Sequence, residues 1–377
     1  MAKYYKSMFT GPQRDALLDR IAQGDSPKWT GHADVEGLKA IGWTDEDIAY
    51  YQENGVNWNE EDDQYHKVSD DNKALYGVLT ADNISTYKNR IVYLPKIDTS
   101  AKTNMSTMFY ECFSLVFIPH LDTSNVISMH NMFAGCRSLV SIPQLNTSKV
   151  TNMGYMFYQC RSLVSIPQLD TSKATNMNNM FCQCNLLVSI PQLDTSNATD
   201  MGYMFSYCYS LVSIPQLNTS KATVINYIFS SCYSLVSIPQ LDTSKVTSMG
   251  NVFKACFSLI SIPQIDTSNV TNMYNMFADC YSLVSIPQLD TSKVTNMNSM
   301  FAGCSLLTTA KLNSVKLSCQ LNDSALLSKE SLLYLINNEA ATSAITITLH
   351  SYAYERLAND ADVVAALANH PNISLAK

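Results

Sequence analysis

A 24-residue repeat runs through the middle of this 377-residue chain. Cysteines recur at that step from Cys112 to Cys304, and phenylalanines keep the same step from Phe109 to Phe301. The nine copies stay in register without an insertion, which chance does not produce. A unit this short cannot bury its apolar face alone, so neighbouring units must stack on one another. The repeat therefore predicts a solenoid.

Each unit divides into two halves, as the unit at residues 281–304 illustrates. A short apolar run around Pro287 is typical of a brief strand, because proline lacks an N–H and is tolerated best near a strand end. The following Asp290, Thr291 and Ser292 supply oxygen acceptors that cap the free N–H groups of a helix or turn. Five apolar residues then recur with the spacing of one helical face: Val294, Met297, Met300, Phe301 and Cys304.

These features predict an α/β repeat, a leucine-rich-repeat type of solenoid made of nine 24-residue units over residues 89–304. Both ends of a solenoid must be closed. Residues 1–88, with all three tryptophans, predict a helical N-terminal domain for attachment and capping, with helices that begin near Thr10 and Thr44. Residues 305–377 predict an α/β C-terminal capping segment. Its expected elements are a helix at 328–336, a strand at 344–350 and a helix at 360–368.

The charge of −7 is unevenly distributed along the chain. Residues 1–88 carry 9 Lys and Arg against 16 Asp and Glu, whereas residues 89–304 carry 11 against 10. Nucleic-acid binding needs a clustered basic surface, so no nucleic-acid partner is expected. No apolar run approaches the roughly 18–20 residues of a membrane helix, and the first residues lack a secretory apolar region. We therefore expect folding in a cytoplasm, without membrane insertion.

The cysteine ladder has two interpretations. Stacked cysteines would lie about 4.8 Å apart, within reach of a disulfide or a shared metal ion. Each cysteine nevertheless closes an apolar face, and the total of eleven is odd. Buried free thiols are therefore favoured. Cys182 is the exception, because it occupies a position that is expected to face outward.

An aspartate ladder keeps the same step from Asp98 to Asp290, with Asn146 and Asn218 as replacements. Stacked carboxylates could bind calcium. Capping is the simpler interpretation, because Asn caps as Asp does. We expect no metal and no other cofactor. The six scattered histidines and the lack of a Gly-rich phosphate loop also lead us to expect no enzymatic activity.

The positions that vary among the units favour Tyr, Asn, Arg and Gly, which are common in recognition surfaces. They follow the first Met, the Phe and the Cys of each unit, and we expect them to face outward. Drift after recent duplication is the alternative, but drift does not explain a preference for Tyr over Lys and Glu. The candidate binding residues are Arg137, Tyr155, Arg161, Tyr203, Tyr207, Tyr209, Tyr227, Tyr233, Tyr274 and Tyr281.

Residues 265–283 carry the elements Asp-Thr-Ser, Met-Phe-x-x-Cys and Ser-Leu, and they resemble the BspA-like leucine-rich-repeat family. The resemblance extends over about residues 89–310 and implies a bacterial surface protein with adhesion as its activity. The flanks are similar to tail-fibre proteins from phages of gut bacteria, through residues 9–18 and residues 344–372.

Repeats and flanks together predict a non-enzymatic phage structural protein, a virion component of the tail or fibre that is made in the host cytoplasm. Its solenoid would bind a host cell-surface glycan or protein. Residues 1–88 would attach it to other virion proteins, and a homo-oligomer is a further possible assembly. The alternative is a BspA-like adhesin on the bacterial cell surface.

Overall fold

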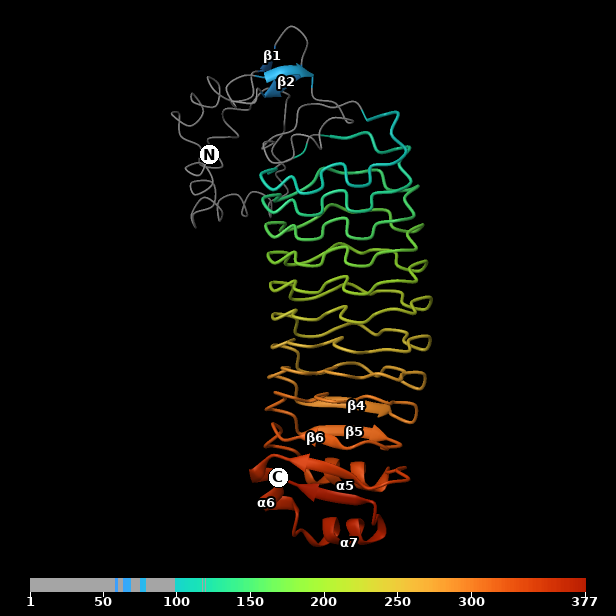
Figure 1. The fold of residues 1–377 in the computed structure, drawn as a ribbon, viewed down its shortest axis with the longest axis vertical. Helices are drawn as coiled ribbons and strands as arrows, with labels where there is room; N and C mark the ends of the chain where they lie inside the picture. Colours follow the sequence, from blue (N-terminus) through green and yellow to red (C-terminus); the bar gives the residue numbers. More distant parts are fainter. Residues whose placement is uncertain (1–57, 60–63, 69–74, 79–98, 117, 119) are drawn as a thin grey trace, which may run out of the picture.

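A computed structural model describes residues 58–59, 64–68, 75–78, 99–116, 118 and 120–377. From residue 99 onward the chain winds into a stack of coils, which forms one straight column in Figure 1. Isolated parallel bridges join residues 24 positions apart, as from Asn104 to Ser128 and from Ser128 to Asn152. The expected repeat solenoid is therefore the observed architecture.

The second half of each coil is a run of turns and not the expected helix. Turn bonds are present, since the Met132 N–H donates to the Met129 carbonyl at 3.1 Å. The Asn131 N–H instead donates to the Gly154 carbonyl of the next coil, also at 3.1 Å. Asn131 has φ 57°, in the left-handed region where a right-handed helix cannot continue. The prediction of helical segments within the repeat is wrong.

The first half of most coils is extended, but few backbone hydrogen bonds join it to its neighbours. The Val140 N–H donates to the Val116 carbonyl of the preceding coil at 3.3 Å, and the proline of each unit has no N–H to donate. Among the residues described in the repeat region, regular strands form only at its C-terminal end. There β4 (Ser285–Asp290) pairs in parallel with β5 (Thr309–Asn313).

One continuous apolar core fills the column. The ladder phenylalanines are fully buried, and their rings stack between neighbouring coils with centroids 5.4 to 5.9 Å apart. The nine ladder cysteines are buried and free, as predicted. The Cys136 thiol donates to the Phe109 carbonyl of the preceding coil at 3.1 Å. Burial raises the pKa of the Cys256 thiol to about 12, so that thiol stays protonated near neutral pH.

Cys182 is buried as well, with 3% of its surface exposed, so the expectation that it faces outward is wrong. Ala134 and Ser206 hold the same place in other coils and are fully buried. On a helix this position would lie opposite the core. In the observed turns it packs against the neighbouring coils instead.

The column ends in an α/β unit (Figure 1). Strands β6 (Cys319–Leu321), β7 (Ile345–Leu349) and β8 (Ile373–Ala376) form a parallel sheet in that order. Helices α5 (Lys329–Asn337) and α7 (Ala361–Asn369) begin after the capping residues Ser328 and Asp360. These two helices and β7 confirm the three elements predicted in this segment. The short helix α6 (Ser351–Leu357) was not predicted.

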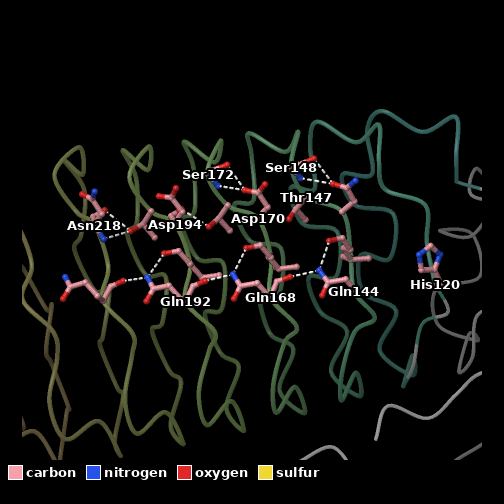
Figure 2. A pocket seen from close by; sticks show the side chains of 17 residues that line it. His120, Gln144, Thr147, Ser148, Gln168, Asp170, Ser172, Gln192, Asp194 and Asn218 are labelled. Carbon is pink, nitrogen blue, oxygen red and sulfur yellow. Dashed lines mark hydrogen bonds between the residues drawn. The ribbon is translucent and has the colours of Figure 1, made fainter. Parts of the chain in front are cut away.

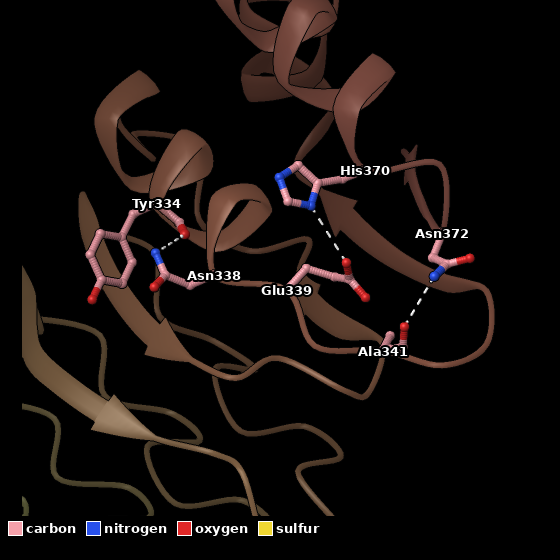
Figure 3. A network of polar contacts seen from close by, with 6 residues as sticks. All are labelled: Tyr334, Asn338, Glu339, Ala341, His370 and Asn372. Carbon is pink, nitrogen blue, oxygen red and sulfur yellow. Dashed lines mark hydrogen bonds and ion pairs between the residues drawn. The ribbon is translucent and has the colours of Figure 1, made fainter.

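Polar contacts hold the turns of this unit together (Figure 3). His370 Nδ1, after α7, lies 3.5 Å from Glu339 Oε2, after α5. The Asn372 side-chain amide donates to the Ala341 carbonyl at 3.0 Å. The unit is therefore fixed both through its sheet and through the ends of its helices.

The described parts of residues 1–88 are strands. β1 (Trp58–Asn59), β2 (Gln64–Val68) and β3 (Leu75–Val78) form an antiparallel sheet. A purely helical N-terminal domain is therefore wrong. The helices expected near Thr10 and Thr44 lie outside the described residues. Of the helices that are described, none is long and apolar enough to span a membrane.

Candidate binding surface

The residue two positions after the first Met of each unit has a positive φ, between 53° and 60°. Asn and Gly tolerate this left-handed conformation best. The frequent Asn at these positions therefore follows from the backbone and needs no recognition role, contrary to our expectation. We call these residues the first turn row: Thr107, Asn131, Tyr155, Asn179, Tyr203, Tyr227, Asn251, Asn275 and Ser299.

Tyrosine is not explained in this way. Tyr155, Tyr203 and Tyr227 have φ of 58° to 59°, and a bulky residue held there costs about 1 kcal/mol or more. Tyr207 belongs to a second turn row, two positions after the Phe of each unit, and has φ 61°. Four tyrosines thus occupy left-handed backbone positions that other coils fill with smaller or more flexible residues, namely Asn, Gly, Ser, Thr, Ala, Asp, Gln and Glu.

The corner row follows the ladder cysteine, where the chain turns from one half-coil to the next. Its first coils carry Arg137 and Arg161, and its later coils carry aromatic rings. The guanidinium carbon of Arg137 lies 4.7 Å from the centre of the Phe113 ring. The members of the corner row are Phe113, Arg137, Arg161, Asn185, Tyr209, Tyr233, Phe257, Tyr281 and Ser305.

Four rings of the corner row form one continuous stack. Centroids are 4.4 Å apart between Tyr209 and Tyr233, and 4.3 Å between Tyr233 and Phe257. The stack ends at Tyr281, 5.0 Å from Phe257. Phe257 was not among the predicted binding residues, although its position after a ladder cysteine was signal enough to include it. Tyr207 joins the stack edge-on, with its centroid 6.3 Å from that of Tyr209.

The predicted binding residues therefore fall into groups. Tyr203 and Tyr227 stack on each other at 4.4 Å, and Tyr207 extends the corner stack. Tyr155 packs instead against the Tyr158 ring at 5.6 Å. Tyr274 has no ring contact with the others among the residues described.

The expectation that all ten candidates face outward is met only in part. Tyr207, Tyr274 and Tyr281 are 40–46% exposed, and the two arginines are also exposed. The other five are half-buried: Tyr155, Tyr203, Tyr209, Tyr227 and Tyr233.

Stacking decides what these rings can offer a partner. The two inner rings, Tyr233 and Phe257, have their faces covered by their neighbours, so only their edges and the Tyr233 hydroxyl remain accessible. Burial, reinforced by the neighbouring Tyr227, raises the pKa of the Tyr203 phenol. That hydroxyl is therefore protonated at neutral pH and can donate a hydrogen bond.

A groove of about 1100 Å³ lies on the extended half of the coils (Figure 2). Along it, the Gln144 side-chain amide donates to the Gln168 backbone carbonyl of the next coil at 2.6 Å. The Gln168 side-chain amide donates to the Gln192 backbone carbonyl in the same way. These side-chain bonds link coils where backbone bonds are few. The sequence did not predict the groove as a hollow.

The aspartates beside the groove cap turns, as predicted. Asp170 Oδ1 accepts from the Ser172 hydroxyl at 2.6 Å and from its N–H at 3.0 Å. These bonds lower the pKa of the Asp170 carboxyl. Asn146 accepts from Ser148 in the same geometry. Over the part of the chain that the structure describes, no cluster of three His, Cys, Asp or Glu is arranged to hold a metal ion.

A family model described as "Mycoplasma protein of unknown function, DUF285" matches three overlapping stretches of the chain, residues 81–187, 163–260 and 234–329. No curated protein matches the sequence.

Solved structures that the chain is similar to include leucine-rich-repeat proteins of bacteria. One, from T. pallidum, is 19% identical, with a TM-score of 0.29, over 57% of this chain and 76% of that one. A leucine-rich cell surface protein from Faecalibacterium prausnitzii is 19% identical, with a TM-score of 0.30, over 64% and 84%. A leucine-rich-repeat protein from Eubacterium ventriosum is 16% identical, with a TM-score of 0.35, over 70% and 81%.

Proposed function

The chain belongs to the DUF285 family, whose model matches it over residues 81–329, and we propose that it is a non-enzymatic binding protein. The solenoid serves as a rigid scaffold, and residues of the turn rows carry recognition of a cell-surface glycan or protein. The core and the capping residues barely change from coil to coil, so the turn rows can vary without loss of the fold.

The observation that carries this proposal is the presence of Tyr155, Tyr203 and Tyr227 at positive φ. Sister coils place Asn at the same position without strain. A residue held in a costly conformation calls for a compensating role. Tyrosine provides a large rigid contact area together with a hydroxyl, which suits recognition.

Two locations are compatible with such a binder. The likeness of residues 9–18 and 344–372 to phage tail-fibre proteins supports a virion component that attaches to other virion proteins through residues 1–88. The likeness of the repeats to BspA-like proteins supports an adhesin on the bacterial cell surface. Mass spectrometry of purified virions and of washed cell envelopes separates the two, since the protein should be enriched in only one of them.

The binding role is tested with a triple variant, Tyr155→Asn, Tyr203→Asn and Tyr227→Asn. Asn fits the left-handed backbone, so we expect the circular dichroism spectrum to stay unchanged. Adsorption of the fluorescent full-length protein to a panel of gut bacterial strains should fall at least about tenfold, as for the loss of interface hot spots. The matched control replaces three exposed threonines of the same coils, Thr151, Thr199 and Thr223, with Asn.

Equal adsorption of the folded triple variant and the wild type would remove the first turn row from the proposal. The groove along Gln144, Gln168 and Gln192 would then be the next surface to test. A wild-type protein that adsorbs to no strain would contradict the binding role itself.

A further inference from the structure

The side chains of the corner row change from positively charged to aromatic along the column. Its early coils carry the exposed arginines Arg137 and Arg161. Its later coils carry the stacked rings from Tyr209 to Tyr281. Neither arginine forms an ion pair with a carboxylate in the part of the chain that the structure describes. The arginine half therefore offers positive charge and N–H donors, and the aromatic half offers the hydroxyl oxygens of Tyr209, Tyr233 and Tyr281 as acceptors.

A carboxylate lies beside the aromatic half. Asp279, in the second turn row, accepts a hydrogen bond from the Tyr281 hydroxyl at 3.4 Å and is only half-buried. The opposite end of the same row carries Glu111. The later coils thus pair aromatic rings with a negative charge, as a partner for an arginine would require.

We propose that two copies of the chain associate antiparallel along their corner rows, with Tyr209 opposite Tyr209 of the other copy. An equal 24-residue step on both copies then places Arg137 opposite Tyr281 and its neighbour Asp279, and Arg161 opposite Phe257. A two-fold axis makes every such contact twice, as in most homodimers.

Charge selects the antiparallel direction, and the pairing of Arg137 with Asp279 defines the register. A parallel arrangement with a two-fold axis along the column would place Arg137 against Arg137 and Arg161 against Arg161, which is repulsive. An antiparallel arrangement shifted by one coil, with Asn185 opposite Tyr209, would bring Asp279 against Glu111.

This inference goes beyond the proposed function and uses different residues. It assigns the corner row to self-association, whereas the recognition role is tested on the first turn row at Tyr155, Tyr203 and Tyr227. Loss of one activity without the other is therefore observable, because adsorption and oligomeric state are separate measurements.

Sedimentation equilibrium of the full chain at low salt is the test, over about 1 to 100 µM protein. The expected mass is twice the 41.9 kDa of one chain. Arg137→Asp and Asp279→Arg each place like charges in contact, so each should raise the dimer dissociation constant at least about tenfold. The double variant, with both reversals in one chain, should restore the dimer, because the pair is re-formed with its signs exchanged. Lys173→Asp, an exposed reversal on another corner, is the matched control and should dimerise like the wild type.

A monomeric wild type at the highest concentration would overturn the proposal. So would a dimer that tolerates both single reversals, a folded double variant that stays monomeric, or a control that dissociates as well. If a reversal prevents folding, the milder Arg137→Gln and Asp279→Asn replace it, and a dimer that neither of them weakens would equally overturn the proposal.

Discussion

At the scale of single residues, burial on the ladders decides stability. Phe205 is fully buried and stacks on Phe181 at 5.7 Å and on Phe229 at 5.9 Å. We predict that Phe205→Ala lowers the free energy of unfolding by about 3–5 kcal/mol, the usual cost of removing a core aromatic. Urea unfolding measures this. Tyr274→Ala, at a 41% exposed position, is the control and should cost little. A similar small loss for Phe205→Ala would show that the Phe ladder is not the core.

The thiols give a second residue-scale prediction. Burial raises the pKa of Cys182, Cys256 and Cys304 to about 12, and only the thiolate reacts readily with alkylating agents. Iodoacetamide should therefore label the ladder cysteines only after denaturation, as read by intact-protein mass spectrometry. Extensive labelling of the native protein would contradict this packing.

At the scale of elements, the Asp-Thr-Ser turns link stability to pH. Hydrogen bonds from Ser172 lower the pKa of Asp170 below its ordinary value of 3.8. A lowered folded-state pKa contributes stability that is present above about pH 4 and is lost as the pH falls through the lowered value. Asp170→Asn keeps the cap, as Asn146 shows, and should reduce the loss of stability between pH 7 and pH 3.

Asp170→Ala removes the cap and should cost about 1 kcal/mol at pH 7. Urea unfolding of the wild type and of both variants at the two pH values checks these expectations. If the Ala and Asn variants behave alike at pH 7, the cap does not stabilise the turn.

The elements also show where sequence reasoning stops. Apolar residues three positions apart predicted a helix, and they are buried as expected. Every second residue of the turns bonds to the residue three before it, as from Met132 to Met129, so the turns bury apolar residues at the spacing of a helix. The positive φ at Asn131 distinguishes these turns from a helix. The spacing of apolar residues in the sequence carries no information on φ. In the C-terminal cap, Ser328 and Asp360 are clear N-cap signals, and α5 and α7 were predicted correctly.

The candidate site was predictable only as a set of varying positions. The sequence identified Tyr203 and Tyr209, but it did not show that each stacks on a ring of the next coil. It also overlooked Phe257 and the groove along Gln168. Both depend on how neighbouring coils approach each other, and this depends on hydrogen bonds between coils that no single unit reveals.

At the scale of the whole molecule, core packing and inter-coil hydrogen bonds hold the column together. We therefore predict that folding needs no metal. EDTA should leave the thermal unfolding midpoint unchanged, and added calcium should not raise it. A marked fall with EDTA that calcium reverses would show that the aspartate ladder binds calcium and does not only cap turns.

The central claim is that the first turn row touches the recognised surface, and a cross-link tests it most directly. A photo-reactive phenylalanine analogue at Tyr203, in the full-length protein bound to adsorbing cells, should cross-link to a cell-surface component. The same analogue at Gln192, exposed on the groove side of the same unit, should not. Cross-linking from Gln192 with none from Tyr203, at equal adsorption, would contradict the account.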